Sequence, residues 1–214
     1  MTAIISDDVP KASSQLHRLE NTSAEVGLSI NKEKTEAVII GCDGMITTSD
    51  GHPIKSVNDF VYLGLPFDPD KAIAHRKNLA WLAARRLAKI AFSKSHMSIK
   101  ISLFHSVVES VLLYGLETVP LTATRAARLN ATHRQLLRFG IGVRYPDIIS
   151  STVLYDTTKV APATTTLDVR RSILFQRIRR QPDSPAATLL RHEPSEMLRR
   201  GGASRQTFRK LYLQ

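Results

Sequence analysis

Patterns typical of β-strands occur only before Asp70, and the rest of the chain shows helical patterns alone. Beyond that residue the sequence is rich in alanine, and apolar residues recur at spacings of three and four, the period of an amphipathic helix. Strands at one end of a chain and helices at the other are typical of the α+β class. We therefore expect a helix-and-antiparallel-sheet unit over residues 1–68 and an all-helical region after it.

The first unit is predicted to begin with one amphipathic helix, from Pro10 to Val26. Asp7 or Asp8 can cap its start, and Gly27 can end it. Short strands are expected afterwards, at residues 28–31, 37–40 and 60–64, with a hairpin that joins 45–47 to 53–55 through the turn at 49–51. The core of this unit is predicted to contain Leu16, Leu19, Ile30, Val38 and Ile40.

The helical region is predicted to contain helices at residues 71–92, 99–114, 122–139, 148–155, 167–180 and 185–200. We divide it into a helical domain at 69–145, a helical extension at 146–200 and a loose basic tail at 201–214. The core of the helical domain is expected to include Ile90, Leu103, Val107, Val111 and Leu136. Trp81, Leu82 and His105 are predicted to be packed residues as well.

Charge changes sign at the same place as the structural pattern. Residues 1–70 contain five Lys/Arg and eleven Asp/Glu, a net charge of −6, whereas residues 71–214 contain twenty-five and eight, a net charge of +17. A polyanion such as nucleic acid is the natural partner for the second region, through its phosphates. The alternatives are that these residues only solvate helix faces or pair with the acidic region. The candidate phosphate-binding residues are Arg76, Lys77, Arg85, Arg86 and Lys89.

Three segments, in this order, resemble the end of the reverse transcriptase domain of non-LTR (LINE-type) retrotransposons. They are the GLSINKEKT run at residues 27–35, the FVYLG run at 60–64 and the LLYGLET run at 112–118. Val119 stands where the family usually has tryptophan. Residues 137–144 resemble a further stretch of the family, and the helix with Arg170 and Arg171 has a counterpart there as well.

This resemblance implies a palm end over residues 1–68 and a thumb over 69–145. Phe60, Tyr62, Leu63 and Gly64 would form the primer-grip segment, although sheet core is the alternative role for such strand residues. Gly27, Asn31, Lys32 and Lys34 would form the motif D segment. A motif D lysine could protonate the leaving pyrophosphate, and the alternative is a solvated lysine in a turn.

Asp7 and Asp8 look like the paired aspartates with which polymerases hold divalent ions, but two features argue against that role. Pro10 follows almost at once, and proline cannot serve a central hairpin strand. The eighteen residues from Val9 to Val26 are also fewer than the family places between its aspartate pair and the motif D glycine. We expect the catalytic pair to precede Met1. This chain would then have no catalytic residue, metal or cofactor of its own, and magnesium would belong to a full-length enzyme.

The expected function is that of a truncated RNA-directed DNA polymerase remnant, inactive alone, with residual non-specific affinity for RNA or DNA duplex phosphates. The alternative is a small basic helical interaction module unrelated to polymerases, in which the strands of residues 28–65 would form no sheet under the first helix. Cys42 is the only cysteine, which favours a reducing intracellular compartment, cytoplasmic or nuclear. No apolar run is long enough for a membrane span, so no membrane partner is expected. The sequence also has no P-loop, no paired histidine ligands and no zinc motif.

Overall fold

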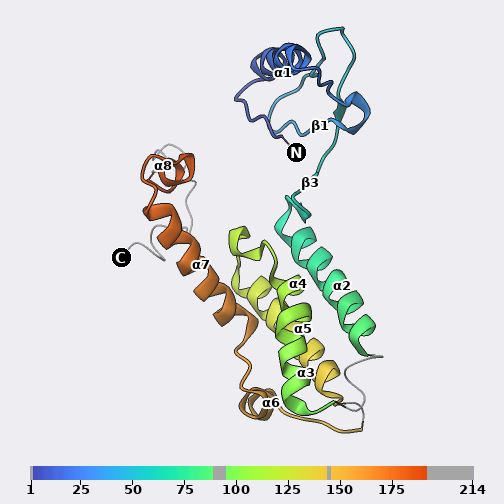
Figure 1. The fold of residues 1–214 in the computed structure, drawn as a ribbon, viewed down its shortest axis with the longest axis vertical. Coiled ribbons are helices and arrows are strands. Elements are labelled where there is room, and N and C mark those ends of the chain that lie inside the picture. The colour runs from blue at the N-terminus through green and yellow to red at the C-terminus, as the bar shows by residue number, and fades with distance from the viewer. Residues whose placement is uncertain (1, 89–94, 144–145, 192–214) are drawn as a thin grey trace. The chain divides into compact units, whose positions relative to one another are not determined.

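The computed structural model describes residues 2–88, 95–143 and 146–191, and all structural statements below concern these residues. The chain forms two compact units, Met1–Ala72 and Ile73–Gln214 (Figure 1). The first unit combines one long helix with short strands, and the second is helical, so the α+β class is confirmed.

The first unit begins with helix α1, Val9–Glu25, within one residue of the predicted bounds. Asp8 caps it, because one carboxylate oxygen accepts a hydrogen bond from the backbone N–H of Lys11 at 2.6 Å. Asp7 forms an ion pair with the Lys11 side chain. The predicted capping role of the two aspartates is therefore confirmed for Asp8, and Gly27 follows the helix with a φ of +76°.

The strands of the first unit form two separate pairs instead of the expected single antiparallel sheet. Strand β1 (Glu36–Ala37) pairs in parallel with β2 (Lys55–Ser56), and β3 (Val61–Tyr62) pairs antiparallel with β4 (Leu65–Pro66). Between β1 and β2 the predicted hairpin is present, with Thr47 bridged to Pro53. The hairpin turns the chain back before β2, so that β2 runs in the same direction as β1.

The predicted strand at residues 28–31 is wrong. Asn31 instead caps the short 3₁₀ helix η1 (Lys32–Lys34), its side-chain oxygen accepting from the backbone N–H of Lys34 at 3.0 Å. Such local bonds from asparagine compete with strand pairing. The core prediction is confirmed for Leu16, whereas Leu19, Ile30 and Val38 are half-buried. Ile40 is 78% exposed, because β1 ends at Ala37 and no pleated strand continues to turn Ile40 inward.

Contacts from α1 hold the hairpin in place. The His17 ring donates from Nε2 to the carbonyl oxygen of Thr47 at 2.9 Å, and the Glu20 carboxylate accepts from the Ser49 N–H at 2.7 Å. A Cβ atom at Gly44 would lie 3.0 Å from the Val9 side chain, so glycine permits this close approach. These contacts therefore pack the hairpin against α1.

The second unit is built from helices that follow the predicted order. They are α2 (Pro69–Ala88, which begins in the first unit), α3 (Met97–Leu103), the π-helical segment η2 (Phe104–Glu109), α4 (Ser110–Leu113), the 3₁₀ turn η3 (Leu116–Thr118), α5 (Ala123–Ile141), α6 (Ser151–Thr158), α7 (Ala163–Arg179) and α8 (Pro185–Arg191). The Thr122 side chain caps α5 by accepting from the Arg125 N–H, and the helix ends at Ile141, two residues beyond the predicted end at residue 139. None of the described helices is long and apolar enough to cross a membrane.

Helix α5 lies at the centre of this unit, in contact with α3, η2, α6 and α7 (Figure 1). Leu136 is buried as predicted. On the continuous helical segment formed by α3, η2 and α4, Leu103, Val107 and Val111 are only half-buried. The fully buried row of this segment is Phe104, Val108 and Leu112. Both rows are apolar at the same spacing, so the sequence alone does not choose between them. The predicted core residue Ile90 lies outside the described residues.

The prediction that His105 is a packed residue is wrong. Its side chain is exposed and lies 2.6 Å from the Glu109 carboxylate, Nδ1 to Oε2. The other oxygen of the buried Glu109 lies 3.1 Å from Nε2 of His133, which is fully buried on α5. A buried carboxylate is stabilised by such donors, and its contact with His133 joins the π-helical segment to α5.

Candidate nucleic-acid interface

The basic residues predicted to bind phosphates on α2 have different environments. Lys77, Arg85 and Arg86 are exposed, whereas Arg76 is buried at 6% exposure. Lys89 lies outside the described residues. Residues 77, 81 and 85 lie in one row of the helix, since they recur at a spacing of four. Lys77 and Arg85 therefore share one face of α2, whereas Arg86, nine residues after Lys77, projects from another side of the helix.

Arg76 is part of the interior packing of the helical unit. Its guanidinium lies over the Tyr114 ring, 4.3 Å from the ring centroid, in a cation–π contact. Burial lowers the pKa of Arg76, while the proximity of Tyr114 and Glu117 acts in the opposite direction. The structure thus places Arg76 inside, where its charge joins α2 to the Tyr114 segment, and not on the surface with the other basic residues.

Trp81 packs on α5, as predicted. Its ring meets Phe139 edge to face with the centroids 5.5 Å apart, and the Arg85 guanidinium lies 6.0 Å above it. Leu82 is 49% exposed, so the prediction that it is a packing residue is wrong. The Trp81–Phe139 contact joins α2 to α5, and Arg85 lies beside Trp81 because it is four residues later on the same helix.

Helix α5 contributes basic residues that were not among the sequence candidates. It contains Arg125, Arg128, Arg134 and Arg138 and no acidic residue. Arg138 donates to the carbonyl oxygen of Ile149 at 3.0 Å, which connects α5 to the start of α6. The absence of acids from this nineteen-residue helix is a sequence signal that could have identified it as part of a phosphate-binding surface.

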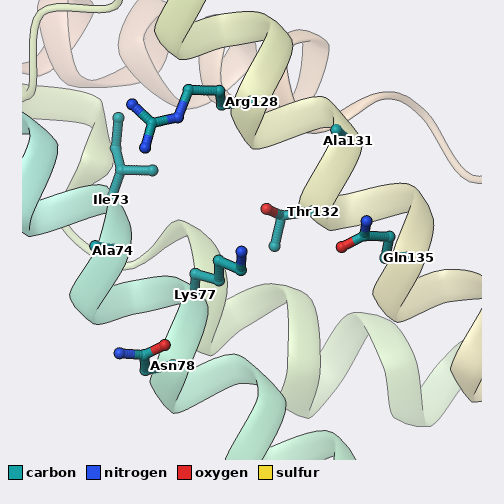
Figure 2. A pocket seen from close by; sticks show the side chains of 8 residues that line it. All are labelled: Ile73, Ala74, Lys77, Asn78, Arg128, Ala131, Thr132 and Gln135. Carbon is teal, nitrogen blue, oxygen red and sulfur yellow. The ribbon is translucent and has the colours of Figure 1, made fainter.

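A groove of about 340 Å³ separates α2 from α5 (Figure 2). Its lining residues are Ile73, Ala74, Lys77, Asn78, Arg128, Ala131, Thr132 and Gln135. Figure 2 shows the side chains of Lys77 and Arg128 reaching into the space between the helices from opposite walls. The groove has two cations, three neutral polar side chains and no acid in its lining, so it is suited to an anionic ligand.

Two acids elsewhere in the helical unit are engaged by a neighbouring cation or by histidines. Burial raises the pKa of Glu109, but hydrogen bonds and charge from His133 and His105 outweigh it, and the net effect holds the pKa below its usual range. Asp168 lies 3.6 Å from the Arg171 guanidinium.

The motif D-like segment is arranged as a capped turn. Asn31 caps η1, Lys34 is exposed, and Lys32 forms an ion pair with Asp50 in the hairpin turn. Hydrogen bonds from Lys32 and Thr48 lower the pKa of Asp50. Lys32 therefore ties η1 to the hairpin.

The primer-grip-like segment forms the tight β3–β4 hairpin. Leu63 and Gly64 form its turn, both with positive φ, at +50° and +77°. Phe60 stacks on Phe67 with ring centroids 5.8 Å apart, and Tyr62 meets Phe60 edge to face at 6.4 Å. Tyr62 and Leu63 are exposed at 38% and 60%, so the predicted alternative of sheet core does not describe them.

The segment that resembles the thumb motif is anchored by a later helix. Gly115 takes a left-handed φ of +73° after Leu113 and Tyr114 and allows the chain to turn into η3. Arg171 of α7 then donates to the carbonyl oxygens of Leu116, Glu117 and Val119. Within the described residues, no group of three or more metal-ligating side chains is found.

Among curated proteins, the chain is similar to a protein of Caenorhabditis elegans that is described as an uncharacterized transposon-derived protein. The two are 27% identical over 149 residues, which cover 65% of this chain and 53% of the relative. The chain thus spans about half the length of the curated relative that it matches. No protein-family model matches the chain. No solved structure matches it either. The similarity is consistent with a transposable-element origin.

Proposed function

We propose that this chain comes from the carboxy-terminal palm and thumb of a non-LTR retrotransposon reverse transcriptase, and that its helical unit binds RNA or DNA duplex through phosphates. The order of the three motif-like segments and the similarity to a transposon-derived protein support the origin. A thumb holds a duplex by its phosphates, which calls for a basic helical region after a mixed palm end.

The observation that carries the binding proposal is the basic surface of α2 and α5. Lys77, Arg85 and Arg86 on α2 are exposed, and Arg128 on α5 lines the same groove as Lys77. Among the residues that line this groove there is no acid. Because phosphate contacts dominate sequence-independent affinity, such a surface binds duplex largely without regard to base sequence.

The first unit has an acidic net charge that could compete for this surface, but four of its acids already have partners of their own. Asp7 pairs with Lys11, Glu36 with Lys55, Asp50 with Lys32 and Asp59 with Lys71, all within that unit. Each of these four acids therefore has a basic partner within its own unit.

The test is a salt titration of binding between the whole chain and a mixed-sequence duplex, followed by fluorescence anisotropy. With roughly five phosphate contacts, the logarithm of the affinity should fall against the logarithm of salt concentration with a slope near −4.5. A second duplex of different sequence should give the same slope and similar affinity. A flat salt response, or binding confined to one sequence, would contradict phosphate-dominated binding.

A further inference from the structure

The α2–α5 groove differs from the exposed arginines of α2 in size and chemistry. At about 340 Å³ it falls within the range of pockets that enclose small molecules. A nucleic-acid duplex is too wide to enter a space of this size. A single nucleotide of an unpaired strand, in contrast, is of the right scale to be taken in.

The lining of the groove is divided into charged, neutral polar and apolar groups. Lys77 and Arg128 reach into it from the two helices (Figure 2). Asn78, Thr132 and Gln135 add amide and hydroxyl groups, which donate and accept hydrogen bonds. Ile73, Ala74 and Ala131 supply apolar surface. A nucleotide combines a phosphate, a polar sugar and a flat apolar base, so each kind of lining group has a counterpart on it.

The groove also has a firm end wall. Trp81 lies one turn after Lys77 and Asn78 on α2, and Phe139 lies one turn after Gln135 on α5. The two rings are in contact at this end of the groove. This contact holds the two helices at a set separation. Thr132 is buried, and its neighbour His133 is fixed by the buried Glu109. The wall that α5 contributes is therefore held by interior packing and does not depend on surface side chains alone.

We infer that the α2–α5 groove is a binding site for one nucleotide of a single-stranded segment, with Lys77 and Arg128 contacting its phosphodiester. This inference rests on the proposed function and adds a second mode of contact to it. Arg85 and Arg86, on the open surface beyond Trp81, contact duplex phosphates, while the groove takes an unpaired nucleotide next to the duplex.

Filling the groove without changing charge tests this site. Ala74 is exposed and lines the groove, so Ala74→Trp should occupy the space meant for the nucleotide. Ala127 is an exposed alanine of α5 outside the groove lining, and Ala127→Trp is the matched control. Each whole-chain variant is titrated with a blunt duplex, a single-stranded oligonucleotide and the same duplex with a single-stranded extension. Thermal unfolding of both variants verifies that they fold.

Ala74→Trp should weaken binding of the single strand by roughly a hundredfold, as expected for two lost charge-assisted hydrogen bonds. Blunt-duplex binding should stay within about twofold, and Ala127→Trp should match the wild type with all three probes. In addition, Lys77→Gln should reduce the single-strand salt slope by about 0.7. Unchanged single-strand binding in Ala74→Trp, or equal weakening for the single strand and the blunt duplex, would overturn the inference. Absence of salt-dependent duplex binding in the wild type would instead contradict the proposed function.

Discussion

Arg171 on α7 donates a 2.7 Å hydrogen bond from Nη2 to the carbonyl oxygen of Val119, fifty-two residues earlier in the chain. The same guanidinium reaches the carbonyl oxygens of Leu116 and Glu117, so one buried side chain satisfies the backbone of η3. The Leu116 carbonyl also accepts from the Val119 N–H at 3.2 Å, so Arg171 adds side-chain donors to the backbone bonding of the turn. Arg171 therefore joins α7 to the turn that follows the segment resembling a thumb motif.

Removal of this side chain should strongly destabilise the helical unit. Arg171→Ala removes the side-chain donor shared by these three carbonyl groups, and we expect a loss of about 3 kcal/mol in the free energy of unfolding. Urea unfolding followed by the fluorescence of Trp81, the only tryptophan and a residue of the same unit, measures it. Arg177→Ala, an exposed arginine of α7, should change stability by no more than about 0.5 kcal/mol. Equal losses in the two variants would show that the carbonyl contacts are unimportant.

The Glu109 carboxylate should make the stability of the helical unit pH-dependent. Its pKa in the folded chain lies below the usual value, because the His133 and His105 hydrogen bonds together overcome the opposing effect of burial. A carboxyl group whose pKa is lower in the folded than in the unfolded chain stabilises the fold. Its full contribution is present above the pKa that the group has in the unfolded chain, about 4.3. This contribution is lost as pH falls further, through the folded pKa.

Glu109→Gln should therefore flatten the stability profile below about pH 4.3. At neutral pH the variant should also lose about 1–2 kcal/mol, because the amide cannot accept from both histidines as the carboxylate does. Urea unfolding at a series of pH values gives the profile. Asp156→Asn, which removes an exposed carboxylate on α6, is the charge-matched control. A Glu109→Gln profile as steep as that of the control would show that the histidine contacts do not stabilise the ionised form.

The exposed arginine pair on α2 should account for part of the salt dependence of duplex binding. Arg85→Gln combined with Arg86→Gln removes up to two phosphate contacts, so the salt slope should become shallower by about 1.8. Arg179→Gln combined with Arg180→Gln removes the same charge from another exposed adjacent pair, at the end of α7. In salt titrations, the slope for duplex binding should become shallower in the Arg85/Arg86 double variant and change less in the Arg179/Arg180 double variant. Equal changes would indicate that net charge alone, and not the α2 surface, determines binding.

Asp8 should matter for folding and not for chemistry. Its carboxylate caps α1, so Asp8→Ala should cost about 1 kcal/mol of stability, measured by denaturant unfolding. In a primer-extension assay with magnesium and deoxynucleotides, we expect no extension by the wild-type chain or by the variant. Extension by the wild type that Asp8→Ala abolishes would show that Asp8 takes part in the chemistry as well as capping α1.

Local sequence was sufficient to predict the helices and some of their ends. The helical period after Asp70, the cap at Thr122 and the Asp8 cap each depend on residues within one or two turns. The turn at residues 49–51 was predictable for the same reason, since its geometry is set by its own residues. The strands were less predictable, because two-residue pairs such as β1–β2 depend on partners brought together by the fold.

The sequence by itself thus determined an α+β chain with an acidic mixed unit followed by a basic helical one, because periodicity, capping and charge are local properties. Only the tertiary structure decided which basic residues face outward. Arg76 is buried against Tyr114, whereas Lys77, its neighbour in sequence, lines a groove with Arg128 of another helix. Likewise, Phe104 rather than Leu103 faces the core, and Glu109 meets His133. These relationships depend on how α2, η2 and α7 pack around α5, and packing joins residues that are far apart in the chain.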